Sequence, residues 1–173
     1  MPAIRSAALP VTYVVLRVLI VLNWLTFAAT LFLLVAPFTR DWIVEALDLQ
    51  RSPSADRIVF GLRAIAVIGL AMAPFYHIIL TRLSAIVAST RAGDPFTPAN
   101  VSRLRQIGWT AIGLQLGGLV IAGIVDTIST KAHPVDIDAG PSVAGWLAML
   151  LAFVVAQGFA EGARMRNDLE GTV

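Results

Sequence analysis

Residues 91–105 read Arg91-Ala-Gly-Asp-Pro-Phe-Thr-Pro-Ala-Asn-Val-Ser-Arg-Leu-Arg105, a basic, turn-rich stretch between two long apolar runs. Gly93 suits the left-handed position just after a helix end, and Pro95 stops that helix from continuing. Thr97 is a suitable N-cap for a new helix with Pro98 at its first position, where the missing N–H costs nothing. The stretch therefore predicts a helical hairpin with a tight turn.

The composition on either side of this turn indicates a membrane protein. Of the 173 residues, 57% are hydrophobic and only 14% are charged, whereas a soluble domain carries about 25% charged residues. With 13 Lys+Arg against 11 Asp+Glu, the chain lacks the basic face that direct nucleic-acid binding needs. There are no cysteines, which excludes disulfides, thiolate catalysis and Cys-ligated metals.

Four charge-free runs mark the expected membrane spans. They contain 22, 18, 20 and 22 residues, at 18–39, 64–81, 106–125 and 139–160. At about 1.5 Å per residue, each can cross a hydrocarbon core of about 30 Å if the helix extends slightly past its charged ends. The predicted fold is all-α, an integral membrane bundle of four transmembrane helices with a cytoplasmic helical hairpin extension.

The expected boundaries form one domain over residues 1–173. Its parts are spans at about 12–39, 58–81, 106–125 and 140–160, the hairpin at 82–105 and a C-terminal helix at 161–170. The first run exceeds the roughly 7–15 apolar residues of a secretory signal, so we interpret it as a retained span. The connection 40–56 has the pattern of a short interfacial helix with Trp42 at headgroup level. Pro74 predicts a kink in the second span.

Orientation follows from the distribution of Lys and Arg, which favour cytoplasmic segments. Eight arginines lie on the side of the termini and the hairpin: Arg5, Arg17, Arg82, Arg91, Arg103, Arg105, Arg164 and Arg166. Five basic residues lie on the other side: Arg40, Arg51, Arg57, Arg63 and Lys131. Both termini and the hairpin are therefore predicted to be cytoplasmic, in a multi-pass membrane protein.

The strongest candidate site is a docking surface on the hairpin and the C-terminal helix. Its candidate residues are Arg91, Asp94, Phe96, Asn100, Arg103, Arg105, Glu161 and Arg164. Arginines in this pattern can hold a soluble partner or anionic lipid headgroups. The alternative interpretation is that they only fix the topology and pair with Glu161, Asp168 or Glu170 of the tail.

A second set of candidates consists of polar side chains inside the spans: Asn23, His77, Gln115 and Gln157. They can line a substrate path, because polar groups in a membrane are costly and often functional. The more common role is hydrogen bonding between helices, and for His77 we favour a neutral imidazole bonded to a neighbouring helix.

Other patterns are weaker. His133, Asp136 and Asp138 could ligate a metal, but a solvated polar loop explains them as well, and we expect no metal, cofactor or catalytic site. The chain shows no nucleophile with its base and no glycine-rich phosphate motif, so an enzyme is not expected. The spacings Gly113-x3-Gly117 and Gly158-x3-Gly162 fit close packing within the bundle or a homo-oligomer face.

Several short motifs together resemble a bacterial family catalogued as domain of unknown function 2975. They are Gly93-Asp-Pro-Phe96, Asn100, Arg103-Leu-Arg105 with Ile107-Gly108, and the ending from Phe159-Ala-Glu-Gly162 to Asp168-Leu-Glu-Gly-Thr-Val173. The resemblance implies a small four-helix membrane protein with no established enzyme activity. Genes of this family often lie beside those of small helix-turn-helix regulators. The expected function is therefore a regulatory or sensory partner that holds such a soluble DNA-binding regulator at the membrane; the alternative is a small transporter or channel subunit.

Overall fold

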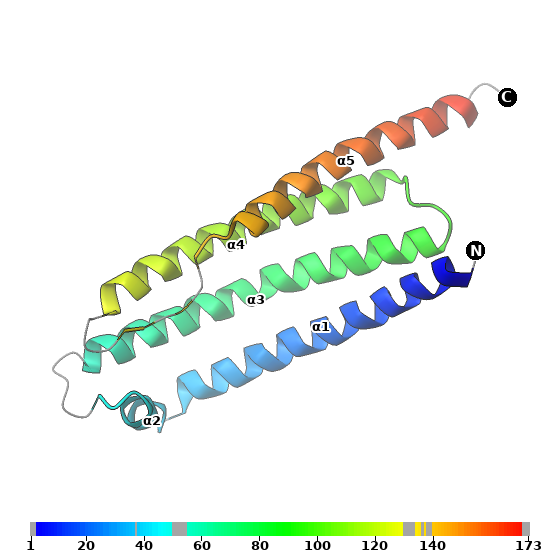
Figure 1. Cartoon of the computed structure of the whole chain (residues 1–173). Helices are drawn as coiled ribbons and strands as arrows, with labels where there is room; N and C mark the ends of the chain where they lie inside the picture. The colour runs from blue at the N-terminus through cyan, green and yellow to red at the C-terminus, as the bar shows by residue number, and fades with distance from the viewer. Residues whose placement is uncertain are drawn as a thin grey trace.

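The computed structural model describes residues 3–36, 38–49, 55–129, 134–135, 137 and 140–170. The described residues form five helices and no strand, which confirms the all-α prediction. The helices are α1 (Ala3–Val35), α2 (Thr39–Ala46), α3 (Ala55–Arg91), α4 (Pro98–Ile128) and α5 (Val143–Glu170) (Figure 1). All except α2 are long and apolar enough to cross a membrane.

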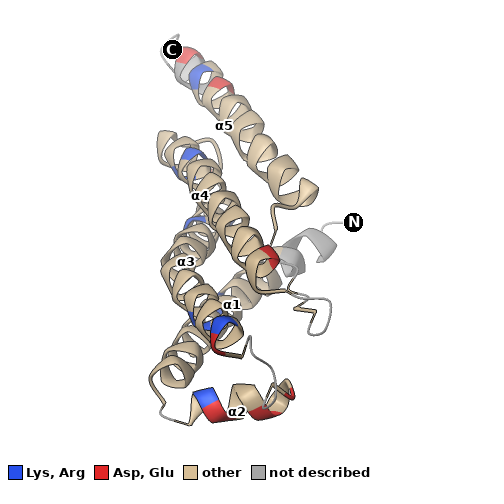
Figure 2. Ribbon diagram, turned by 90° about the vertical axis from the view of Figure 1, so that its left-hand side faces the viewer, with Lys and Arg blue, Asp and Glu red and all other residues tan. Residues whose placement is uncertain are grey.

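The four long helices are longer than the hydrocarbon core of a bilayer is thick. They contain 33, 37, 31 and 28 residues, and at about 1.5 Å per residue even 28 residues exceed a hydrocarbon core of about 30 Å. The charged residues gather toward the helix ends, and the lengths between them are largely free of charge (Figure 2). Each helix therefore has an apolar membrane segment and at least one polar extension.

The helices pack as an open row, an arrangement that the predicted bundle of four transmembrane helices did not specify. Helix α3 packs between α1 and α4, and α5 packs on α4 alone among the long helices. Within the described residues α1 contacts neither α4 nor α5, and α3 does not contact α5. Apolar faces left open in this way can be covered by lipid tails, so no hydrophobic driving force requires the row to close.

The ends of the row differ in what they bring together. The N-terminal part of α1, the α3–α4 turn and the C-terminal part of α5 lie at one end, and α2 lies at the other (Figure 1). We call the first of these the hairpin end. It comprises residues 82–105 and the α5 segment 159–170, which includes the expected C-terminal helix at 161–170 in continuation of the last span.

The first span ends earlier than expected. Helix α1 stops at Val35, whereas the charge-free run suggested a limit at Thr39. The residue before a proline is disfavoured in the helical conformation, and Ala36 precedes Pro37 in the sequence. A count of uncharged residues does not detect this stop. The second span contains Pro74, and α3 is one continuous helix through it; the kink expected there stays a prediction.

The expected short helix in the first connection is α2. Its C-terminal end closes with the left-handed Asp48 (φ 48°) and a hydrogen bond from the Leu49 N–H to the Val44 carbonyl at 2.8 Å. This pattern is the Schellman motif, in which the following apolar residue is commonly packed. Leu49 is fully buried, whereas Trp42 is exposed, as expected for a helix at the membrane surface.

Candidate functional site: the hairpin end

The last turn of α3 closes as the sequence predicted. Gly93 has a φ of +87°, a conformation that glycine adopts without steric cost. The N–H of Asp94 donates to the Ser89 carbonyl at 3.1 Å, and that of Gly93 donates to the Thr90 carbonyl at 3.1 Å. These two bonds pair carbonyls that the helix end would otherwise leave unsatisfied.

The first turn of α4 also matches the prediction. Thr97 is the N-cap, and its hydroxyl accepts a hydrogen bond from the Asn100 N–H at 3.2 Å. Pro98 occupies the first helical position. Because both helix ends are satisfied by residues of the turn itself, the reversal between α3 and α4 is determined locally.

Asn100 holds the turn together from inside. It is fully buried, and its amide nitrogen donates to the Ser89 hydroxyl at 2.6 Å and to the Pro95 carbonyl at 2.8 Å. Its amide oxygen accepts from the Arg103 guanidinium at 2.7 Å. Asn100 was a docking candidate, but a side chain without accessible surface cannot touch a partner. The hypothesis is corrected: Asn100 links α3, the turn and α4.

Phe96 joins the turn to α5. Its ring lies 5.1 Å from that of Phe159, centroid to centroid. A Cβ added to Gly162 would come within 2.9 Å of the Phe96 ring, so the glycine makes room for the aromatic side chain. About half of the Phe96 surface is covered, and its contacts with Phe159 and Gly162 join the turn to α5.

The arginine candidates of the hairpin end differ in solvent exposure and in their hydrogen-bond and ion-pair partners. Arg91 and Arg105 are exposed, and neither forms an ion pair with a carboxylate that the structure describes. Arg103 is half-buried and bonded to Asn100. In the tail, Arg164 lies 3.7 Å from the carboxylate of Glu161, one helical turn away. Of the tail carboxylates, that of Glu161 is thus paired within α5, and the alternative in which Asp168 or Glu170 neutralises the hairpin arginines stays a prediction.

A cluster that the sequence analysis missed lies beside the turn. The Arg17 guanidinium donates to the Tyr13 hydroxyl at 3.1 Å from Nε and at 2.7 Å from Nη2. The Cζ atoms of Arg17 and Arg91 lie 5.2 and 5.7 Å from the centroid of the Tyr13 ring. The spacing of four residues between Tyr13 and Arg17 places both on one helix face and is a signal that the sequence contains. The approach of Arg91 depends on the packing of α3 against α1.

The polar residues inside the spans do not converge on one path. Asn23 donates to the Ala73 carbonyl at 3.2 Å, and the His77 Nδ1 accepts from the Trp24 indole at 3.1 Å, so both lie between α1 and α3. Gln115 donates to the Ser142 carbonyl at 3.1 Å, where α4 meets the start of α5. Gln157 is exposed on α5. The structure shows the expected bond of His77 to a neighbouring helix, and it does not bring the four residues together as a transport path requires.

Most of the glycines in or near these spacings allow close contacts between helices of the same chain. Gly113 and Gly117 face Phe75 and Met72 of α3, whose nearest atoms would lie 2.6 and 3.0 Å from an added Cβ. Gly108 faces Phe153 of α5 in the same way, at 2.7 Å. Gly158, in contrast, has no neighbour within 4 Å. The pair at 113 and 117 is therefore a packing face for α3 and is not available to a second copy.

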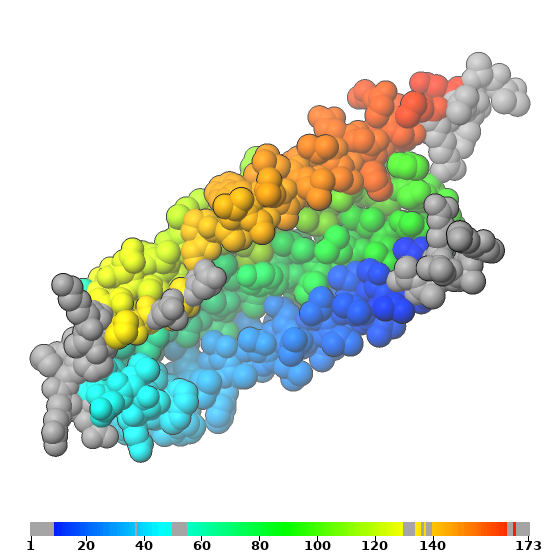
Figure 3. All heavy atoms as spheres, in the orientation of Figure 1, coloured from blue at the N-terminus to red at the C-terminus, as the bar shows by residue number. Residues whose placement is uncertain are grey.

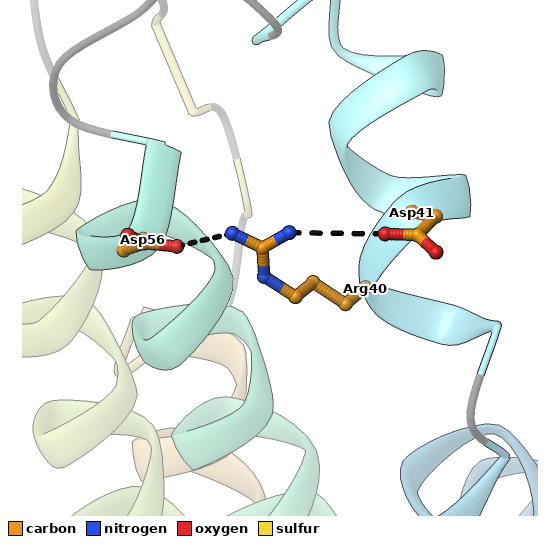
Figure 4. Close-up of polar contacts among 3 residues, drawn as sticks. All are labelled: Arg40, Asp41 and Asp56. Atoms are coloured by element: carbon orange, nitrogen blue, oxygen red, sulfur yellow. Dashed lines mark hydrogen bonds and ion pairs between the residues drawn. The ribbon is translucent and has the colours of Figure 1, made fainter.

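The opposite end of the row carries a separate ionic link. Arg40 of α2 lies 2.7 Å from the carboxylate of Asp56 at the start of α3, and 3.7 Å from that of Asp41 (Figure 4). The hydrogen bond and the charge of Asp56 raise the pKa of Arg40 above its usual value. Arg57 also donates to the Thr127 carbonyl of α4. This end ties three helices together and has the contacts of a structural site.

The metal-site hypothesis concerns residues that lie outside the described part of the chain. His133, Asp136 and Asp138 all fall there. Among the residues that are described, no group of three or more His, Asp or Glu side chains is arranged to hold a metal ion.

Taken together, the four long apolar helices and the polar turn define a multi-pass membrane protein. The family model described as "Protein of unknown function (DUF2975)" matches residues 49–173, and the chain belongs to that family. The match covers α3, α4 and α5 with the hairpin end, and begins after α1 and α2. No curated protein and no solved structure matches the chain.

Proposed function

We propose that the protein is a membrane-bound docking platform that holds a soluble regulator at the inner face of a bacterial inner membrane. The hairpin end would face the cytoplasm together with both termini, because basic residues favour that side. The partner would be a helix-turn-helix regulator of the kind encoded beside genes of this family. The role is regulatory or sensory and requires no catalysis, no cofactor and no direct contact of this chain with nucleic acid.

The observation that carries the proposal is the junction of Phe96 with Phe159 and Gly162. It joins the α3–α4 turn and the end of α5 into one surface, which is a larger target than either element alone. Exposed arginines lie on that surface without carboxylate partners among the described residues, Arg105 among them. Such a surface is complementary to an acidic face of a soluble protein, and complementary charge favours both the encounter and the correct partner.

Burial limits which candidate residues can contact the proposed partner. Asn100 is buried, and Arg103 is engaged by it, so both act inside the turn. Arg105, Arg91 and Arg164 are exposed. We therefore assign docking to exposed arginines and a positioning role to Asn100 and Arg103.

The test measures binding of the purified regulator to the full chain in nanodiscs. Arg105→Glu is expected to weaken binding about tenfold or more, because like charges brought together at an interface cost several kcal/mol. Asp126→Arg is the control, since it also reverses a charge on an exposed side chain, near the end of α4 that lies away from the hairpin end. Equal affinity for wild type and Arg105→Glu, or no binding of the regulator by the wild type, would overturn the proposal.

A further inference from the structure

Two arginines from different helices meet at one tyrosine ring at the hairpin end. The Cζ atom of Arg17 on α1 lies 5.2 Å from the centroid of the Tyr13 ring, and that of Arg91, the last residue of α3, lies 5.7 Å from it. Figure 3 shows the blue part of α1 beside the green part of α3 at this end. We call Tyr13, Arg17 and Arg91 the tyrosine–arginine cluster. It holds two positive charges no farther apart than the two distances together.

The charges of the cluster are not neutralised by the described part of the chain. Arg17 and Arg91 are both exposed, and neither forms an ion pair with a described carboxylate. Each guanidinium is attracted to the face of the ring, but two like charges held this close at a surface repel each other. An anion between the two guanidinium groups replaces this repulsion by two attractions.

Hydrogen bonds to Tyr13 orient the Arg17 guanidinium for such an anion. Its Nε and Nη2 donate to the Tyr13 hydroxyl at 3.1 and 2.7 Å. Each of the two terminal nitrogens of an arginine carries two N–H groups, and Nη1 makes no hydrogen bond to any described residue. The edge formed by Nη1 and Nη2 is therefore open and held in one direction. Arginine binds phosphate through two parallel hydrogen bonds from an edge of this kind.

The apolar surface around the cluster places it at the boundary of the membrane. The apolar length of α1 is Leu9–Val35, which contains 27 residues. At about 1.5 Å per residue it extends about 40 Å, so it crosses a hydrocarbon core of about 30 Å and continues into the headgroup layer. Next to Tyr13 and Arg17 in the sequence, α1 exposes Val14 and Val18. Lipid therefore covers the helix beside the cluster, and lipid headgroups lie at the level of the two arginines.

We propose that the tyrosine–arginine cluster binds the phosphate group of an anionic membrane lipid, whose oxygens accept hydrogen bonds from Arg17 and Arg91. A lipid uses both halves of the surface, because its phosphate meets the guanidinium groups and its acyl chains cover the valines. A free phosphate ion uses only the first half. A zwitterionic lipid carries the same phosphate but adds a positive charge beside the two arginines.

The site is separable from the proposed docking function. It shares Arg91 with the docking surface, but the docking test depends on Arg105, which makes no contact with the Tyr13 ring among the described residues. Failure of the lipid site leaves the Arg105 result as it stands. Failure of regulator binding likewise leaves the lipid preference as it stands.

The test counts lipids bound to the detergent-solubilised full chain by native mass spectrometry. Phosphatidylglycerol and phosphatidylcholine with identical acyl chains are titrated separately. Each arginine engaged with an anionic headgroup favours it by about fivefold, so we expect the first phosphatidylglycerol to bind about 25-fold more tightly than the first phosphatidylcholine. Arg17→Gln and Arg91→Gln should each reduce this preference about fivefold, and the double variant should abolish it.

Two variants separate a built site from a merely positive surface. Tyr13→Leu keeps both arginines and the net charge but removes the ring and the hydroxyl that bring them together, so it should abolish most of the preference. Arg105→Gln is the matched control for the arginine variants, because it removes an exposed arginine of the same end that does not contact Tyr13. It should leave the preference unchanged. An excess of inorganic phosphate should leave phosphatidylglycerol bound.

Three outcomes would overturn the inference. Equal binding of the two lipids by the wild type means that no anionic lipid is selected. A preference that persists in Tyr13→Leu, or that falls as much in Arg105→Gln as in Arg17→Gln, assigns it to charge spread over the hairpin end and not to the cluster. Displacement of phosphatidylglycerol by inorganic phosphate makes the ligand a free ion and not a lipid.

Discussion

Asn100 at the start of α4 donates a hydrogen bond of 2.6 Å to the hydroxyl of Ser89 in the last turn of α3. The two residues are eleven positions apart, and the bond closes the turn from inside, where Asn100 has no solvent-accessible surface. The same side-chain amide also donates to the Pro95 carbonyl and accepts from the Arg103 guanidinium. One side chain thus determines how two membrane helices meet at the hairpin end.

Replacing Asn100 should destabilise the protein measurably. In Asn100→Ala the partly buried carbonyl of Pro95 and hydroxyl of Ser89 lose their donor, which costs about 1–3 kcal/mol. Unfolding of the full chain in mixed micelles with increasing SDS measures the change. Ser102→Ala, at an exposed position in the same helical turn, should stay within about 0.5 kcal/mol of wild type. A loss for Asn100→Ala no larger than that of the control would contradict the structural role.

The glycines should differ in a defined order when each is changed to alanine. Gly108→Ala pushes on the ring of Phe153, which itself packs on Trp109, so we expect a loss of about 1–3 kcal/mol, as for overpacking. Gly117→Ala meets the flexible thioether of Met72 and should cost less. Gly123→Ala meets open space and should be neutral. Thermal unfolding in one detergent ranks the three, and a Gly123 loss equal to that of Gly108 would refute the packing scheme.

The contact between α1 and α3 can be measured through Trp24 and His77. Their hydrogen bond of 3.1 Å should appear in a double-mutant cycle of Trp24→Phe and His77→Phe as a coupling of about 0.6 kcal/mol, with about 1.7 kcal/mol as the upper end for such bonds in membranes. A second cycle of Trp24→Phe with Trp146→Phe is the control. Since α1 and α5 do not touch among the described residues, this coupling should be near zero. Equal coupling in both cycles would mean that α1 does not pack as the structure shows.

The orientation can be tested directly because the chain has no cysteine. Ser102→Cys introduces an exposed thiol at the hairpin end, and Glu45→Cys introduces one on α2 at the opposite end. If the basic end is cytoplasmic, an impermeant maleimide should label Glu45→Cys in intact spheroplasts and Ser102→Cys only after permeabilisation. The reverse pattern would place the proposed docking platform outside the cell.

The parts of the fold that follow from neighbouring residues were predictable. Gly93, Thr97 and Pro98 each act within a few residues of themselves, so the turn was found at the correct positions. The family resemblance was confirmed as well. The end of α1 was missed because a charge count does not register the effect of Pro37 on its predecessor.

Features that depend on packing between distant segments were not predictable. The open row was missed because spans that are apolar on every side do not indicate which face meets a neighbour. The burial of Asn100 was missed because Ser89 and Pro95 approach it only when the turn is folded. The sequence does contain a pattern that indicates the groove between α1 and α3, which small residues of α3 line. Ala66, Gly69 and Ala73 recur at intervals of three and four residues, a spacing that places small side chains on one face of a helix.

The open row has a consequence for how the protein responds to its surroundings. With no closed interior, each long helix has part of its surface against fatty-acid tails, and α1 rests on α3 and α2 alone. Membrane thickness, fluidity and composition then act directly on the junctions between helices and are not buffered by a sealed core. The surrounding bilayer thus covers faces that a closed protein interior would bury, and we expect a change in its lipids to act first on the contact between α1 and α3.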